Sequence, residues 1–451
     1  MLLWSALVVT AVALAWAGVR LWRIAAIGSA YRSKVLCSIV FGSQRVVDAQ
    51  RVDDVAGDSY RLLRLFRSRV DPVACTVTTS LFGLRPRTAI HRPGLGATLF
   101  LSGSGVRRQV DLASPAQAGR YVPTTIALQV RTTTAPIQRV VERTFTEPNP
   151  KRLRRTRAIV VLRDGEIVAE QYARGFSAAT PLPGWSMTKS VLNALIGILV
   201  GEQRLSLTDT ALLPQWQPPD PRAAITLEDL LRMRSGLKFS EMYADFSSDV
   251  IEMLFNQPDA ARYAARQPLD FAPATTWSYA SGTSNILSAI VRRVVGEPDY
   301  WEWPRRMLFD PLGMPSAILE PDEAGTFVCS SFMLATAREW ARFGQLFLQD
   351  GVWNGHRILP DGWVSFSTTP TAQSTGENYG AHWWLKLQPE IGGGTRAAAR
   401  IPPDAFFAIG HEAQTLTVIP SRRLVVVRLG LSIYIDSWNQ AEFLAELLDA
   451  L

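Results

Sequence analysis

A serine and a lysine that lie three residues apart are the first candidates for chemistry in this chain. Ser186 and Lys189 occur in the segment WSMTKS, and residues with this spacing face the same side of an α-helix. The apolar run VLNALIGILVG that follows predicts a helix buried at the centre of a domain. The segment PLPG upstream ends any earlier element, so we expect Ser186 at the helix N-terminus, where negative charge is stabilised. The pair is therefore a candidate serine nucleophile with a lysine base.

A second serine and lysine share this spacing but not this context. Ser235 and Lys238 enclose Gly236, where the sequence predicts the end of a helix. Their side chains need not share a face, so we assign the chemistry to Ser186 and Lys189.

A tyrosine in the segment WSYASGTSNIL is the third candidate. A lysine with a lowered pKa can accept the serine proton, and a nearby tyrosine can share it and deliver it to the leaving group. Tyr279 supplies such a phenol, and Ser281 belongs to a short polar run suited to carrying hydrogen bonds into a site. Taken by itself, Tyr279 is better explained as a residue that caps the helix that follows.

The composition of the 451 residues is that of a globular protein, with 47% hydrophobic and 19% charged residues. The net charge is +7, but the basic residues are scattered, and we interpret the cluster KRLRRTR at 151–157 as a solvated segment. Nucleic-acid binding is therefore not expected. Cys37, Cys75, Cys329 and the histidines show no metal-ligand spacing, so no metal or other cofactor is expected; one disulfide is possible and none is required.

The N-terminus predicts a membrane segment. The first nineteen residues carry no charge and are roughly long enough to span a bilayer as a helix, and Arg20 and Arg23 follow. A cleavable signal peptide normally carries positive charge before its apolar run, and here there is none. We therefore expect a single-pass membrane anchor at residues 1–24, with a cleaved signal peptide as the alternative. The basic flank favours a cytoplasmic body, but long domains can translocate despite such charges, so the side stays open.

Two further regions are expected after the anchor. Residues 25–140 predict a β-rich N-terminal extension, with short β-like runs at VLCSIVFG, ACTVTTSLFG and ATLFLSG. Residues 141–451 predict one domain that opens with a hairpin around Asp164 and Gly165.

The rest of this domain alternates between helices and strands. A helical middle includes a helix that is expected to begin at Thr226 and to close at Gly236. Strands are expected at YGAHWWLKLQ, AFFAIGHEAQTLTVIP and RRLVVVRLGLS, before a final helix at SWNQAEFLAELLDAL. This order predicts an α+β fold in which one mostly antiparallel sheet is assembled from both ends of the domain and covered by helices.

Four segments together carry a resemblance to a known family. WSMTKS, LLRMRSGL, WSYASGTSNILSAIV and AIGHEAQTLTVIP, in this order, resemble the serine hydrolases of the class C β-lactamase and penicillin-binding-protein superfamily. The sequence is most similar to the branch of 6-aminohexanoate-dimer hydrolases and related esterases. The resemblance extends from about Arg157 to the C-terminus and implies a β-lactamase-like fold with a helical subdomain.

The resemblance also implies a role for each candidate. Ser186 would be the acylated nucleophile, Lys189 its proton acceptor, and Tyr279 the acid/base partner that protonates the leaving group and later helps to activate water. Which of the lysine and the tyrosine acts as the base during acylation is disputed across such enzymes.

The third motif of the superfamily falls at His411-Glu412-Ala413, with alanine where glycine is usual. The resemblance implies substrate-binding roles for His411, Gln414 and Ser281, with the backbone N–H groups of Ser186 and Gln414 forming an oxyanion hole. The alternative for His411 is a histidine at a strand end that is bonded to the backbone. Glu412 is expected on the solvated surface.

These observations support a serine hydrolase that cleaves a small-molecule amide or ester through an acyl-enzyme. The third motif lacks the lysine that normally binds a substrate carboxylate, which argues against a dedicated β-lactamase or D-Ala-D-Ala peptidase. A catalytically silent, membrane-bound binding or sensor protein is the alternative from another class, and the intact Ser186, Lys189 and Tyr279 argue against it. An α/β-hydrolase would need G-x-S-x-G, and the segment GWSMT lacks the second glycine.

Overall fold

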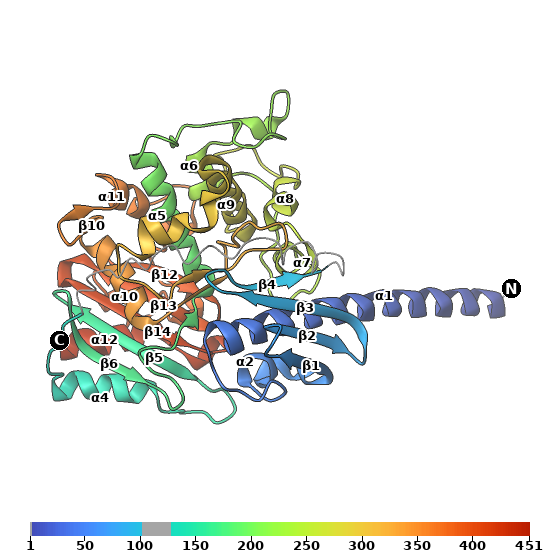
Figure 1. The fold of residues 1–451 in the computed structure, drawn as a ribbon, viewed down its shortest axis with the longest axis horizontal. Helices are drawn as coiled ribbons and strands as arrows, with labels where there is room; N and C mark the ends of the chain where they lie inside the picture. The colour runs from blue at the N-terminus through green and yellow to red at the C-terminus, as the bar shows by residue number, and fades with distance from the viewer. Residues whose placement is uncertain (1, 102–127) are drawn as a thin grey trace.

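The computed structural model describes residues 2–101 and 128–451, and its centre is a five-stranded antiparallel sheet (Figure 1). The strand order is β12-β13-β14-β5-β6. The strands are β5 (Thr156–Arg163), β6 (Glu166–Tyr172), β12 (Phe406–Gly410), β13 (Gln414–Ile419) and β14 (Leu424–Gly430). Because β5 pairs with β14, the beginning and the end of the domain meet in one sheet, as the sequence predicted.

The β5–β6 hairpin shows why these strands form where they do. Asp164 and Gly165 make the turn with positive φ angles of 57° and 82°, the conformation that a two-residue hairpin turn requires. Along β5, Ile159 and Val161 belong to the core on one face of the sheet, whereas Val160 and Leu162 belong to the core on the other. The strand is therefore apolar throughout because both faces of the sheet are covered.

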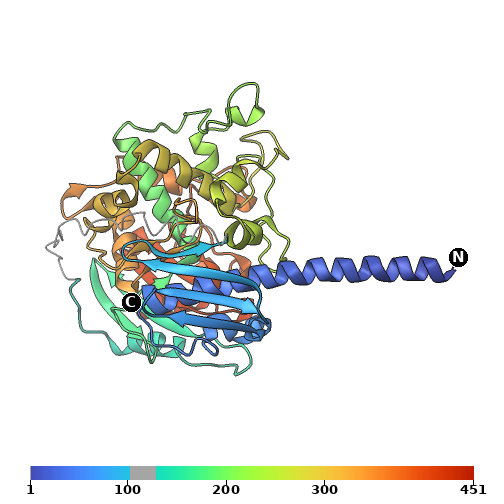
Figure 2. The same ribbon diagram turned by 45° about the vertical axis from the view of Figure 1, so that its right-hand side comes forward.

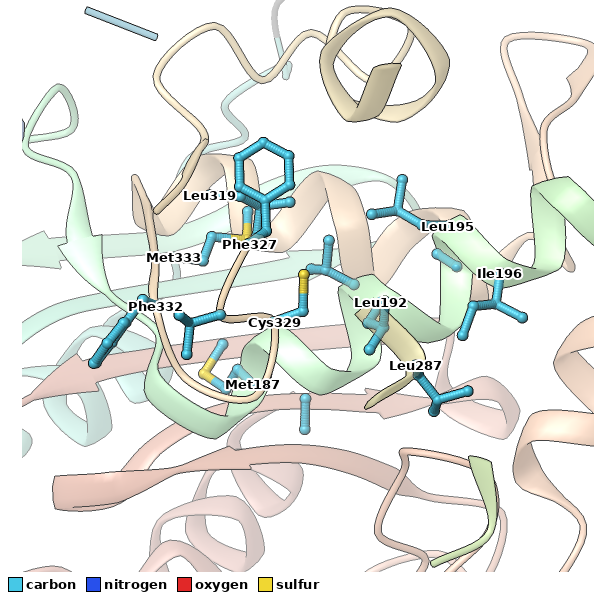
Figure 3. Packing of buried hydrophobic residues seen from close by; sticks show 14 of the residues in the cluster. Met187, Leu192, Leu195, Ile196, Leu287, Leu319, Phe327, Cys329, Phe332 and Met333 are labelled. Carbon is cyan, nitrogen blue, oxygen red and sulfur yellow. The ribbon is translucent and has the colours of Figure 1, made fainter. Parts of the chain in front are cut away.

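Helices cover both faces of this sheet (Figure 1). On one face, α4 (Ala135–Thr144) packs with the C-terminal α12 (Gln440–Ala450). On the other face lie α10 (Ala337–Leu348) and the buried α5 (Thr188–Gly201). Figure 3 shows α5 residues such as Leu192 packing near Phe327 and Cys329 of a loop that passes over the helix.

A helical subdomain stands beside the sheet. It contains α6 (Leu227–Leu231), α7 (Asp249–Asn256), α8 (Ala260–Ala265) and α9 (Ser281–Val295). The capping box formed by Thr226 and Asp229 confirms the expected start of α6. The expected end at Gly236 is wrong, because α6 stops at Leu231 and Met233 already adopts a positive φ of 58°.

The segment YGAHWWLKLQ does not form the strand that the sequence predicted. Only isolated bridges join Tyr379 to Trp384 and Trp384 to Phe407. His382 has a positive φ of 58°, which turns the chain, and its carbonyl accepts a hydrogen bond from Ser190 of α5 over 2.7 Å. Attachment to α5 therefore replaces strand pairing here.

The N-terminal extension combines a long helix with a second sheet. Helix α1 (Leu2–Cys37) runs on into η1 (Ser38–Gly42) and lies against a four-stranded antiparallel sheet. That sheet consists of β1 (Phe66–Asp71), β2 (Thr76–Leu81), β3 (Leu84–Arg92) and β4 (Gly96–Phe100). The strands expected at ACTVTTSLFG and ATLFLSG are confirmed as β2 and β4. Residues 102–127 of the expected extension lie outside the described residues.

The β-like run VLCSIVFG is helical instead, so this prediction is wrong. It contains the end of α1 and the whole of η1. Leu36 and Cys37 are buried against Val77, Ala89 and Ala97 of the second sheet. The apolar residues of the run therefore reflect burial of a helix and not strand pairing.

The first part of α1 projects from the body, and the last part is buried in it (Figures 1 and 2). By length and composition alone, this helix can cross a membrane: an 18-residue window has a mean hydropathy of 1.4 and is 6% buried. A signal sequence has the same properties. The helix continues without a break past residue 24 into the body.

Buried ion pairs join the extension to the main domain. The guanidinium of Arg157 donates two hydrogen bonds to the Asp54 carboxylate, over 2.6 and 2.7 Å, and both residues are buried. Lys34 of α1 pairs with the buried Glu320. The interpretation of the cluster at 151–157 as solvated is therefore wrong for Arg157, although Lys151 and Arg152 are exposed.

Candidate active site

Ser186 lies in the turn η3 (Trp185–Met187) that leads into α5. Lys189 is one turn further on, and its Nζ donates a hydrogen bond to Ser186 Oγ over 3.0 Å. Ser186 is half-buried, whereas Lys189 is only 2% exposed. The structure therefore brings together the two residues that the sequence paired, at the expected start of a buried helix.

Two glycines allow this turn to press against the sheet. A Cβ atom on Gly410 of β12 would lie 2.2 Å from the carbonyl oxygen of Gly184. A Cβ atom on Gly184 would lie 2.3 Å from the ring of Trp340 in α10. Only residues without a side chain permit both approaches, and they fix the position of Ser186 relative to the edge strand β12.

Burial controls the protonation of Lys189. Loss of hydration lowers its pKa to about 8, although the charge of Glu241 raises the pKa in part. Nζ also donates hydrogen bonds to Ser281 Oγ over 3.1 Å and to the carbonyl of Ser330 over 2.8 Å. These acceptors hold the amine beside Ser186, and a lysine with this pKa is suited to accept a proton near neutral pH.

Glu241 is a site residue that the sequence analysis missed. Its carboxylate accepts a hydrogen bond from the backbone N–H of Ser281 over 2.8 Å and a second from the Ser281 hydroxyl. Burial raises the pKa of Glu241, and the charge of Lys189 opposes this rise. Ser281 thus links Glu241 to Lys189, which places this sequence-predicted residue inside the cluster.

Tyr279 lies beside both Lys189 and Ser186. Burial raises its pKa, as does the charge of Glu241, whereas a side-chain hydrogen bond with Ser186 opposes the rise. Its ring lies 4.9 Å from Lys189 Nζ and stacks on Trp384. The N-cap of α9 is Ala280, so Tyr279 is not the cap of that helix. The structure therefore brings Tyr279 together with Ser186 and Lys189.

A second tyrosine, Tyr243, also reaches Ser186 and was missed. It lies in the loop before α7, and burial raises its pKa while hydrogen bonds with Ser281 and Ser186 oppose the rise. Its ring stacks on the imidazole of His411 with centroids 5.1 Å apart. Neither Tyr243 nor Glu241 belongs to a recognisable motif, so only the folded chain reveals them.

His411 follows β12 directly and packs between two aromatic rings. It stacks on Tyr243 and meets Trp185 edge-on at 5.6 Å. Burial lowers the pKa of His411 to about 4. The imidazole is therefore uncharged near neutral pH and lies on the same side of the site as Tyr243.

The expectation that Glu412 is solvated is wrong. Glu412 is 7% exposed and accepts a hydrogen bond from the indole N–H of Trp185 over 3.2 Å. It and Ala413 both have a positive φ of 61°, so the third motif turns the chain between β12 and β13 and draws the Glu412 side chain inward. The pair of Trp185 and Glu412 ties this turn to the residue beside Ser186.

Gln414 begins β13 at this turn and is buried. Its side-chain amide donates a hydrogen bond to the carbonyl of Gly430 over 2.8 Å and accepts one from the N–H of Gly430 over 2.9 Å. The side chain thus bonds to the backbone of β14, and η3 contacts both β12 and β13. The oxyanion role of the Gln414 backbone N–H stays a prediction.

The other S-x-x-K segment does not form such a pair. Ser235 is buried and accepts a hydrogen bond from the N–H of Leu237, whereas Lys238 is exposed. Within residues 2–101 and 128–451, no group of three or more His, Cys, Asp or Glu side chains is placed to hold a metal ion.

An antiparallel sheet covered by helices, with a half-buried serine at the start of a buried helix, defines the β-lactamase-like class of folds. The chain belongs to the beta-lactamase family, because the family model matches residues 141–430, more than half of the chain. This membership confirms the resemblance that the four sequence segments indicated.

The chain is also similar in sequence to a curated hydrolase. A 6-aminohexanoate-dimer hydrolase of Paenarthrobacter ureafaciens is 28% identical over 227 residues, which cover 46% of this chain and 56% of the relative. The chain thus spans about half the length of this curated relative.

Solved structures show the same fold. A Bacillus anthracis protein provisionally described as a 6-aminohexanoate-dimer hydrolase matches with a TM-score of 0.57 and 21% identity, over 73% of this chain and 87% of that one. A family VIII carboxylesterase matches with a TM-score of 0.53 and 15% identity, over 71% of this chain and 98% of that one.

Proposed function

We propose that this protein is a serine hydrolase that cleaves an amide or ester bond through an acyl-enzyme on Ser186. One observation carries the proposal: the Lys189 amine lies 3.0 Å from the Ser186 hydroxyl, and burial lowers its pKa to about 8. A buried amine of this kind activates a serine that is otherwise a weak nucleophile.

The contacts suggest a course for the reaction. Ser186 Oγ attacks the substrate carbonyl while its proton passes to Lys189, either directly or through Tyr279. Tyr279 then protonates the leaving amine or alcohol, which departs, and later helps a water molecule attack the acyl-enzyme. The backbone N–H groups of Ser186 and Gln414 are proposed to hold the carbonyl oxygen as it becomes negative.

The substrate class follows from the third motif and from the relatives. His411 is uncharged near neutral pH and replaces the lysine that binds a substrate carboxylate in β-lactamases and D-Ala-D-Ala peptidases. The similarity to a 6-aminohexanoate-dimer hydrolase supports amides, and the likeness of fold to a carboxylesterase is compatible with esters. We therefore propose an amidase or esterase with substrate contacts from His411, Gln414 and Ser281.

The proposed location is the membrane. Residues 1–24 would form a single-pass anchor at the start of α1, residues 25–140 the extension that joins the anchor to the body, and residues 141–451 the hydrolase domain. The long exposed apolar part of α1 supports this proposal. No cofactor is needed for the proposed reaction.

Turnover measurements test this function. Wild-type protein should hydrolyse p-nitrophenyl esters, short amides or 6-aminohexanoate dimers, and Ser186→Ala and Lys189→Ala should each abolish turnover while folding normally. Turnover that persists in folded Ser186→Ala would refute the proposal.

A further inference from the structure

Exposed apolar side chains surround the point where α1 leaves the body. They come from the end of the segment before β1, from the turn between β2 and β3, and from the loop before α7. We call them the collar: Leu62, Leu65, Phe82, Leu84, Met242 and Phe246. Large exposed apolar side chains grouped in this way mark an interaction surface.

One half of the collar is fixed to α1 through the second sheet. The guanidinium of Arg85 lies 5.0 Å from the ring of Trp22 on α1. Phe82, which is 76% exposed, lies in the turn just before Arg85. Because Phe66 pairs with Leu81, the neighbouring Leu65 lies at the same end of the sheet. Figures 1 and 2 show this turn at the side of the body from which α1 projects.

The other half of the collar belongs to the loop before α7. Arg23 of α1 forms an ion pair with Glu252 of α7 over 2.8 Å, which holds the two helices together. Hydrogen bonds from Ser247 lower the pKa of Asp245, and Arg23 and Arg20 lower it further, so the loop lies near this turn of α1. Met242 and Phe246 in this loop are 62% and 44% exposed.

The same loop also reaches the candidate active site. Tyr243, next to Met242, donates a hydrogen bond to Glu241 over 3.4 Å and stacks on His411. Glu241, on the other side of Met242, accepts the hydrogen bonds of Ser281. Consecutive Cα atoms are only about 3.8 Å apart, so the collar begins within one residue of two groups of the candidate site, Tyr243 and Glu241.

The charge and composition of the collar indicate which kind of surface binds it. Arg20 and Arg85 lie over the rings of Trp16 and Trp22. Tryptophans with adjacent arginines are typical of the boundary between lipid headgroups and acyl chains, and arginines there bind anionic headgroups. Through Arg85 on the exposed Trp22, the collar also adjoins the exposed apolar part of α1, which supports a lipid surface over a protein partner.

We propose that the collar rests in the surface of an anionic bilayer, and that the enzyme takes as its substrate a membrane-resident amphiphile with an ester or amide bond. The substrate class rests on the function proposed above. The loop that carries Tyr243 and Glu241 meets the lipid through Met242 and Phe246, so an amphiphile can present its polar ester or amide to Ser186 while its chain remains in the bilayer.

Site-directed labelling tests the docking, independently of any activity. The full chain with Cys75→Ser keeps only Cys37 and Cys329, which are buried. An environment-sensitive fluorophore is attached at Phe82→Cys, Phe246→Cys or Val73→Cys in vesicles of phosphatidylcholine and phosphatidylglycerol. Val73 is the control because it is exposed in the turn at the opposite end of β2.

We expect spin-labelled lipids to quench the label at positions 82 and 246 at least about threefold more than at 73, because interfacial side chains enter the headgroup region. Equal, weak quenching at the three positions would overturn the docking.

Two fluorophosphonate probes test the substrate class in the same vesicles. Wild type should react with a hexadecyl probe about tenfold faster than with a short-chain probe, because added methylenes favour the bilayer. The double variant Phe82→Ser/Leu84→Ser should lose most of this preference, and Val73→Ser should keep it.

Equal rates for both probes in wild type would overturn the amphiphile proposal. Lipid quenching at 82 and 246 without reaction of either probe at Ser186 would instead contradict the proposed hydrolase function and leave the docking intact.

Discussion

At the scale of single residues, the site depends on how one amine is held. Lys189 Nζ donates hydrogen bonds to Ser186, Ser281 and the carbonyl of Ser330, and the Ser281 hydroxyl donates a hydrogen bond to Glu241. Burial disfavours the ammonium form, whereas the carboxylate of Glu241 favours it. The balance of these two effects sets the pH at which Ser186 becomes reactive.

The pH dependence of acylation follows from this balance. The rate should rise with pH through a midpoint near 8 and level off only above it, because the unprotonated amine is the base. Glu241→Gln removes the charge that raises the pKa of Lys189, so the midpoint should move to lower pH. Stopped-flow acylation across pH measures both midpoints, and an unchanged or higher midpoint in Glu241→Gln would contradict the assignment.

Tyr279 should matter more for poor leaving groups. If it protonates the leaving group, Tyr279→Phe should slow amide hydrolysis by about 10²–10⁴-fold, the usual contribution of a general acid. Hydrolysis of p-nitrophenyl esters should fall much less, because p-nitrophenolate leaves without a proton. Measurement of kcat for amides and for p-nitrophenyl esters tests this role. An equal decrease in kcat for both substrate types would show that Tyr279 does not protonate the leaving group.

The sequence revealed residues in motifs and missed those without one. Ser186 and Lys189 were found because helical spacing places both on one face, and Tyr279 through its polar segment. Tyr243 and Glu241 come from an irregular loop whose position depends on packing between α1, α7 and the site. No local pattern encodes that packing, so their contacts with Ser186 and Ser281 could not be predicted.

At the scale of elements, the approach of η3 to β12 fixes the site. Gly184 and Gly410 allow contacts that a Cβ atom would prevent. β12 is an edge strand of the sheet. The third motif follows directly at the end of β12, and the turn that carries Ser186 packs against this strand.

Gly410→Ala should therefore separate the two elements. The added Cβ atom would lie 2.2 Å from the carbonyl of Gly184, so the turn that holds Ser186 must move. We expect acylation to slow by about 10²-fold, the cost of a displacement near 1 Å. Gly18→Ala is the control for loss of a glycine, because Gly18 lies in helix α1 and a Cβ atom there meets nothing within 4 Å. Similar acylation in both variants, each folded, would contradict this view of the site.

Element prediction succeeded where periodicity and turn chemistry agreed. The β5–β6 hairpin and α6's N-cap both have such local signals. It failed at VLCSIVFG and YGAHWWLKLQ, because short apolar runs do not distinguish a strand from a buried helix or a packed loop. In both cases the partner that decides the conformation is distant in sequence.

At the scale of the whole molecule, the extension is part of the folded body. Glu320 accepts hydrogen bonds from Ser38 of η1 and from the N–H of Ala97 in β4, and it pairs with Lys34 of α1. The sequence showed an extension with strands, but it did not show that charged residues of α1 and the main domain would meet inside the protein.

Substitution of Asp54 tests how much the buried ion pair between the extension and the main domain contributes to stability. Burial raises its pKa, but Arg157 and Arg45 hold the pKa below its usual value. Asp54→Asn leaves the buried guanidinium of Arg157 and the half-buried one of Arg45 without this counter-charge. It should lower the free energy of unfolding by about 3–5 kcal/mol. The exposed neighbour Asp53 also pairs with an arginine, so Asp53→Asn is the matched control and should cost at most about 1 kcal/mol. Denaturant unfolding measures both, and equal small losses would contradict a structural role for the joint.

The central claim is that Ser186 is an activated nucleophile, and intact-protein mass after exposure to a fluorophosphonate tests it most directly. We expect a single adduct on wild type, none on folded Ser186→Ala, and an undiminished adduct on Ser235→Ala, which removes the serine of the other S-x-x-K segment. An adduct that survives Ser186→Ala, or no adduct on folded wild-type protein, would contradict the claim.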